Sequence, residues 1–203
     1  MTDSNNEARE RVLDVAEKLF MTKGFQAVSM RDIAEALGVR QSSLYYHAPQ
    51  GKEQLFCDAA VRSLERHKQQ LDDILRQHEP DFRNQFHAVA RWFVQLDDMD
   101  LVRLVRLDLP EISPTYKSQI AATFYTMLMQ PIAEVVRKQQ AVGNIRKVNA
   151  NALVGGLLSM VSWTSYFNTT GSRPAMDADE VDEMIDLLLD GCWIAPNSVP
   201  PTR

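Results

Sequence analysis

Apolar residues recur along most of this chain at spacings of three and four positions, the period of an amphipathic α-helix. No segment shows the alternation of apolar and polar residues that is typical of a β-strand. Glycine, proline or a capping residue separates most periodic segments from the next. The pattern therefore predicts an all-α fold of about nine helices, at residues 9–23, 29–38, 41–47, 52–76, 81–96, 99–108, 114–141, 149–167 and 177–189.

Two of the longer segments carry further information. Ser113 followed by Pro114 is a strong helix start, and Pro131 lies inside the same helix, where we expect a kink or a local break. Residues 149–167 are apolar nearly all round, so this helix is expected to be buried or to lie in an interface.

The two short segments at 29–48 have the pattern of a helix-turn-helix. Ser29 and Asp32 predict a capped start, and Gly38 allows the left-handed conformation that ends the first helix. Leu44 is expected to hold the second helix on the core, while its other residues are polar or aromatic. Gln pairs with an adenine edge, and Arg with guanine or phosphate, so this helix is a candidate DNA reader. The alternative is a helical hairpin whose second helix is merely solvated.

The longer segment from Arg9 to Phe56 resembles the TetR family of bacterial regulators. The resemblance rests on the amphipathic first helix, Gly24-Phe25, the Arg-Asp-Ile-Ala run at 31–34, the Leu-Tyr-Tyr-His run at 44–47, and Lys52. Ala48 stands where members often have Phe, and Phe56 is an alternative anchor. The link at 49–51 is one residue longer than is common. Motif and resemblance together assign DNA contacts to Ser29, Met30, Arg31, Arg40, Gln41, Ser42, Ser43, Tyr45, Tyr46, His47 and Lys52.

The resemblance covers about a quarter of the chain and implies a ligand-responsive regulator. We expect a DNA-binding head at 7–50, a ligand-sensing and dimerisation bundle at 51–195, and flexible tails at 1–6 and 196–203. We expect a repressor that leaves a palindromic operator when a small-molecule effector binds to it. The sequence does not name the effector, and an activator of the same family is the alternative to a repressor.

The resemblance also implies a homodimer in which the last two helices of each chain pack together. The alternative is that these helices cover the bundle within one chain. The expected interface residues are Leu153, Gly156, Leu157, Met160, Val181, Met184, Ile185 and Leu188.

Aromatic and methionine side chains suit a pocket for apolar ligands, although at helical spacing they are more often core. The candidates are Trp92, Phe93, Met99, Leu104, Tyr116, Phe124, Met127, Trp163 and Phe167.

Composition narrows the class of protein. The net charge is −5, and the first 60 residues hold seven Lys and Arg against nine Asp and Glu, so weak non-specific DNA binding is expected. No secretory signal or membrane-length apolar run is present, which favours a cytoplasmic protein that does not contact membranes. Cys57 and Cys192 are expected to be buried thiols rather than a disulfide.

No catalytic constellation, metal motif or cofactor motif stands out, so we expect neither an enzyme nor a cofactor. Two other functions remain open at this point. One is a helical enzyme or ligand carrier that retains a helix-turn-helix, and the other is an adaptor that uses the same helix to bind protein.

Overall fold

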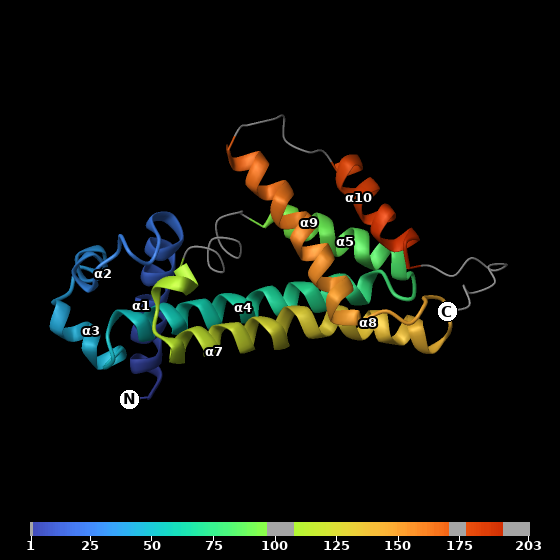
Figure 1. Cartoon of the computed structure of the whole chain (residues 1–203). Coiled ribbons are helices and arrows are strands. Elements are labelled where there is room, and N and C mark those ends of the chain that lie inside the picture. Colours follow the sequence, from blue (N-terminus) through green and yellow to red (C-terminus); the bar gives the residue numbers. More distant parts are fainter. Residues whose placement is uncertain (1, 97–107, 171–177, 193–203) are drawn as a thin grey trace. The chain divides into compact units, whose positions relative to one another are not determined.

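The computed structural model describes residues 2–96, 108–170 and 178–192, with side chains for 6–96, 108–162 and 179–192 (Figure 1). Within these residues every regular element is helical, which confirms the all-α prediction. The α-helices are α1 (Thr2–Lys23), α2 (Met30–Leu37), α3 (Gln41–His47), α4 (Lys52–Gln77), α5 (Phe82–Gln95), α7 (Pro114–Phe124), α8 (Gln130–Ala141), α9 (Ala150–Thr170) and α10 (Ala178–Asp190). A 3₁₀ turn, η2 (Leu109–Glu111), precedes α7, and a π-helical turn, η3 (Tyr125–Met129), joins α7 to α8.

The described residues form two compact units. Residues 2–67 and 108–124 make the first unit, and residues 68–96, 125–170 and 178–192 make the second. The helix α4 therefore contributes to both units, whereas we expected the boundary to precede it. The reason is that its first turns carry core residues of the head, because Leu55, Phe56 and Ala59 are buried.

The first unit is built around a cluster of three phenylalanines. Phe56 of α4 packs against Phe20 of α1 at 5.1 Å and against Phe25 of the following turn at 5.0 Å between ring centroids. Edge-to-face and tilted ring pairs of this kind add to the stabilisation from burial. Phe56 thus supplies the anchor against the first helix, and Ala48 is itself fully buried.

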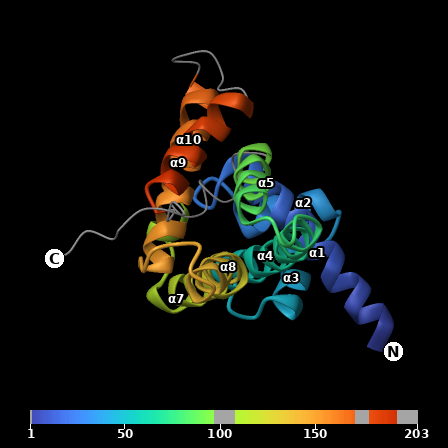
Figure 2. The same cartoon turned by 90° about the vertical axis from the view of Figure 1, so that its right-hand side faces the viewer.

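The second unit places α5 against both α9 and α10, and α9 and α10 lie side by side (Figures 1 and 2). Its core is aliphatic and aromatic, with the buried residues Phe86, Val89, Ile132, Val136, Val154, Leu157, Ile185 and Leu189.

Three expectations need correction or completion. The first helix begins at Thr2 rather than Arg9, so it includes residues 2–6. No Gly or Pro interrupts residues 2–8, which lets the helix continue to the start. The expected helix at 99–108 falls almost wholly outside the described residues. Pro131 does break the long helix: the π turn ends at Met129, and Pro131 sits in the first turn of α8, where its missing N–H is tolerated.

Candidate nucleic-acid interface

The local geometry of α2 and α3 follows from their capping residues. The Ser29 hydroxyl accepts a hydrogen bond from the Asp32 backbone N–H at 3.2 Å, and the Asp32 carboxylate accepts one from the Ser29 backbone N–H at 2.8 Å. These bonds form the predicted capping box, and hydrogen bonds from Ser29 lower the pKa of Asp32. Gly38 has φ 69°, and its backbone N–H and that of Val39 bond to carbonyls of α2. The sequence therefore ends α2 sharply, and α3 starts after a turn of three residues.

The helix α3 has one buried position and a polar outer surface. Leu44 is fully buried, and it alone among the seven residues of α3 is buried. Gln41, Ser42, Ser43 and Tyr45 are exposed, and Tyr46 is 72% exposed. A tyrosine this exposed on a short helix gains little from folding, so it is available to a partner.

The ends of α3 extend this surface. Arg40 is exposed at the N-cap position, and its side chain makes no capping bond. His47, which is half-buried, packs edge-on against the ring of Tyr46 with the centroids 5.2 Å apart. The structure therefore brings Arg40, Gln41, Ser42, Ser43, Tyr45, Tyr46 and His47 together on one short helix and its cap.

Four other expected contact residues are partly engaged within the head. Ser29 is occupied by the capping box, and Arg31 lies 3.6 Å from Glu35 in an exposed ion pair. Met30 is buried, so its side chain packs in the core of the head. The ammonium of Lys52 donates to the Phe25 carbonyl at 3.0 Å and lies 4.1 Å from the centre of the Phe25 ring. Lys52 thus has a bonding role inside the head, which sequence reasoning missed.

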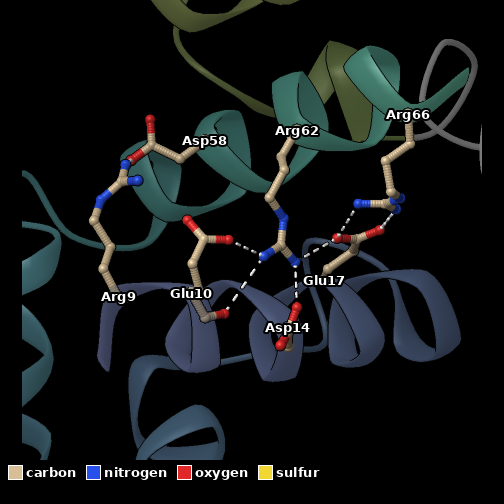
Figure 3. Close-up of polar contacts among 7 residues, drawn as sticks. All are labelled: Arg9, Glu10, Asp14, Glu17, Asp58, Arg62 and Arg66. Carbon is tan, nitrogen blue, oxygen red and sulfur yellow. Dashed lines mark hydrogen bonds and ion pairs between the residues drawn. The ribbon is translucent and has the colours of Figure 1, made fainter. Parts of the chain in front are cut away.

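An ionic network that sequence reasoning also missed ties α1 to α4 (Figure 3). Arg62 of α4 donates to Glu10 at 2.8 Å, to Asp14 at 2.7 Å and to Glu17 at 2.9 Å. Burial opposes the charge of Arg62, but the hydrogen bonds that it donates to the three carboxylates outweigh this effect and raise its pKa. The three acids lie four and three residues apart on one face of α1, and that spacing could have signalled the network.

Comparison with known proteins decides the identity of the head. Residues 12–63 match the family model described as bacterial regulatory proteins, tetR family. The chain is 35% identical over 72 residues to the HTH-type transcriptional regulator LmrA of Bacillus subtilis (strain 168), a match that covers 36% of this chain and 38% of LmrA. Residues 12–63 belong to the TetR family. The matched region is little more than a third of the length of that relative.

The TetR-family fold extends over most of the chain. A TetR-family transcriptional regulator from Mesorhizobium loti superposes with a TM-score of 0.73 at 16% identity, covering 93% of this chain and 98% of its own. AibR, in complex with isovaleryl coenzyme A and operator DNA, superposes with a TM-score of 0.69 at 20% identity, covering 89% and 97%. At these identities the likeness establishes the fold alone.

The expected pocket residues are divided between the two units. Trp92 and Phe93 lie on α5, and Met127 lies in the π turn, all in the second unit. Tyr116 and Phe124 lie on α7 in the first unit. Met99 and Leu104 lie outside the described residues, as do the side chains of Trp163 and Phe167.

Several of these pocket candidates already have contacts of their own. The Trp92 ring N–H donates to Gln70 at 3.2 Å, and its ring lies 4.6 Å from that of Phe93. Phe93 is buried, in keeping with the core alternative.

The expected dimer residues divide by burial. Leu153, Leu157, Val181 and Ile185 are buried within the single chain. Gly156, Met160, Met184 and Leu188 are half-buried. Leu187 of α10 is 70% exposed and was missed, although its spacing of three from Met184 could have indicated it.

Two further findings concern other classes of site. Across the described residues, no helix combines the length and apolar character needed to cross a membrane. Cys57 and Cys192 are free and buried, as predicted, and burial raises the pKa of Cys57 to about 11.

Proposed function

We propose that this protein is a sequence-specific DNA-binding transcriptional regulator, and that α3 enters the major groove. The observation that carries the proposal is the α3 surface: a polar and aromatic face held on the core by Leu44, inside the family match at residues 12–63. Gln41 and Arg40 have the donor and acceptor groups that read base edges, and Ser42, Ser43 and the tyrosines have groups that bond phosphates. Lys52 would contact a phosphate if its ammonium exchanged the hydrogen bond to the Phe25 carbonyl for one to DNA.

The regulatory part of the proposal rests on the relatives. The matched relatives are named as transcriptional regulators, and one further match, KstR2 of Rhodococcus jostii (strain RHA1), is named as a transcriptional repressor. The structural neighbour AibR holds both isovaleryl coenzyme A and operator DNA. We therefore propose a cytoplasmic repressor that a small-molecule effector releases from its operator.

The expected assembly is a homodimer. Two copies would place their reading helices in successive major grooves, with centres about 34–36 Å apart on a palindromic operator. Effector binding would favour a state in which this spacing is wrong, and a coupling of about 1–3 kcal/mol would change operator affinity roughly 5- to 150-fold.

The test is selection of bound duplexes from a random library with the full-length protein, followed by titration of the best duplex with variants. Gln41→Ala is expected to weaken binding by about 5- to 150-fold, because a good bidentate base contact contributes about 1–3 kcal/mol. Gln119→Ala is the matched control, since Gln119 is also an exposed helical glutamine of the first unit. Equal affinity of the Gln41→Ala variant and the wild type would overturn the assignment of α3.

A further inference from the structure

Positive charge is concentrated where α8 ends and the chain turns toward α9 (Figure 1). Residues 137–147, here called the basic segment, hold two arginines, two lysines and no acidic residue. The whole chain has 22 Lys and Arg against 27 Asp and Glu, so the residues outside the segment, with 18 cations, have a net charge of −9. A positive region on an otherwise acidic protein attracts anionic partners and orients them as they approach.

The cations of the basic segment are exposed and largely unneutralised. They are Arg137, Lys138, Arg146 and Lys147. Arg137 donates a hydrogen bond to the neutral side chain of Asn151 at 3.3 Å, which cancels none of its charge. Lys138 lies 3.9 Å from Glu79, but these side chains are 73% and 58% exposed, and so open a surface pair contributes little. The segment therefore presents four cations to solvent.

The turn that carries two of these cations is held in place by hydrogen bonds on both sides. The Gln140 side-chain amide donates to the carbonyls of Arg146 at 3.2 Å and Val148 at 2.7 Å. The Arg146 backbone N–H donates to the carbonyl of Cys192, just after α10, at 3.0 Å. Ile145 is only 2% exposed and anchors the turn in the core of the second unit. A surface that is fixed before binding loses little conformational entropy on association.

An apolar side chain lies among the cations. Val142 is 69% exposed, and its backbone N–H bonds the carbonyl of Lys138 one helical turn earlier, so the two residues share a face. Arg146 follows four residues later. An apolar centre with a charged rim is the usual arrangement of a protein–protein interface. A phosphate backbone would pair with the cations but would gain nothing from the valine.

We propose that the basic segment is a docking surface for an acidic segment of another protein. The partner's carboxylates pair with the four cations, and an apolar side chain between them packs on Val142. Charge complementarity selects an anionic partner, and the exposed valine favours a peptide over a nucleic acid. The inference does not rest on the proposed function, because the basic segment lies in the second unit and the helix-turn-helix lies in the first.

The test measures binding to the full-length protein by fluorescence anisotropy with three labelled probes. The first probe is a short polyglutamate peptide with a central pair of leucines, and the second has serines in place of the leucines. The third is a short DNA duplex of random sequence, which carries negative charge without an apolar side chain. Comparison of the two peptides isolates the apolar contact, and comparison with the duplex separates the two classes of partner.

Three variants accompany the wild type. The double variant Arg146→Glu with Lys147→Glu reverses two cations of the basic segment. Arg76→Glu with Lys117→Glu is the matched control, because it makes the same change in net charge at exposed cations outside the segment. Val142→Ser removes the apolar centre and keeps the charges. All the changed side chains are exposed, so the urea midpoints are expected to stay close to that of the wild type.

The wild type is expected to bind the leucine peptide several-fold more tightly than the serine peptide, because the leucines bury apolar surface on Val142. Reversal of Arg146 and Lys147 should weaken binding of both peptides about tenfold or more, whereas the matched control should change it by about twofold or less. Val142→Ser should bind the two peptides equally.

Four outcomes would overturn the proposal. They are no binding of either peptide to the wild type, equal binding of the two peptides to it, equal weakening in the reversal and the matched control, and a reversal that weakens duplex binding but not peptide binding. The last result would assign the surface to nucleic acid instead. Failure of the protein to select an operator would overturn the proposed function and leave these peptide measurements unaffected, so the two proposals fail separately.

Discussion

At the scale of single residues, the interface between α1 and α4 depends on Arg62. Its guanidinium bonds three carboxylates of α1, and its side chain is 19% exposed (Figure 3). Glu17 is more buried still and is shared between Arg62 and Arg66. A planar guanidinium with five donors suits several carboxylates at once, which a lysine would not. Arg62 is therefore the centre of the charged contacts that hold α1 against α4.

We expect Arg62→Ala to lower the free energy of unfolding by about 2 kcal/mol. The substitution leaves the buried Glu17 with one partner, and it removes the ion pairs of Arg62 with Glu10 and Asp14. Arg66→Ala is the control: its side chain is 49% exposed and contacts Glu17 only at one end of the network, so about 1 kcal/mol or less is expected. Urea titration followed by circular dichroism measures both. Equal losses of unfolding free energy in the two variants would show that Arg62 contributes no more to the network than Arg66 does.

At the scale of elements, α5 and α10 are joined along one edge by a ladder of charges. Arg83, His87 and Arg91 repeat every four residues on α5, and they face Asp182, Asp186 and Asp190, which repeat every four residues on α10. His87 lies with one ring nitrogen 3.1 Å from Asp182 and the other 2.8 Å from Asp186. The matching repeats run in opposite directions along the chain, so the ladder fixes the register of two antiparallel helices.

The ladder makes stability depend on pH in the acid range. Burial opposes the charge of Asp182, but hydrogen bonds from Arg91 and His87 outweigh it and lower its pKa below the ordinary 3.8. Burial is likewise outweighed at Asp186, whose pKa is lowered by hydrogen bonds from His87 and Arg83. A lowered pKa adds stability that is present above the unfolded value and is lost as pH falls through the folded value. The wild type should therefore lose stability below about pH 4.

The free energy of unfolding of the wild type should fall between pH 5 and pH 3. In Asp182→Asn this fall should be smaller by roughly 1 kcal/mol. Glu183→Gln is the control, since Glu183 is an exposed acid of the same helix outside the ladder. The two variants are compared by urea titration at each pH. Identical pH profiles for Asp182→Asn and wild type would contradict a role for the ladder.

The elements themselves were largely predictable from sequence, and the contacts between them were not. Capping residues and glycines fixed α2 and α3 to within a residue or two, because caps act through bonds to their own helix. Pro131 indicated a break, although not that it would take the form of a π turn. The hydrogen bonds of Lys52, Arg62 and Asp108 could not be predicted, since each joins a partner at least 27 residues away.

At the scale of the whole molecule, burial within one chain tells which apolar residues remain for a partner. Apolar residues at helical spacing occupy both buried and exposed positions of α9 and α10. Periodicity alone therefore could not tell which of these residues face the core. In the structure α9 presents small residues on one side, with Ala152 and Ser159 exposed and Gly155 half-buried. On α10, Leu187 is exposed and Met184 and Leu188 are half-buried. A large leucine left exposed beside half-buried neighbours is the kind of patch that a second copy would cover.

If this surface forms the homodimer, a charge at its most exposed apolar position should separate the subunits. Leu187→Glu would place one carboxylate from each copy in an apolar contact, and burying an unpaired charge costs several kcal/mol. Sedimentation of the full chain should then show 23.1 kDa particles instead of particles of twice that mass. Val142→Glu is the control, because Val142 is 69% exposed against 70% for Leu187 but lies at the end of α8. A dimer that survives Leu187→Glu, or is lost equally with Val142→Glu, would place the interface elsewhere. Loss confined to Leu187→Glu should also abolish binding to a two-site operator while leaving weak binding to a half-site, because each α3 reads its own groove.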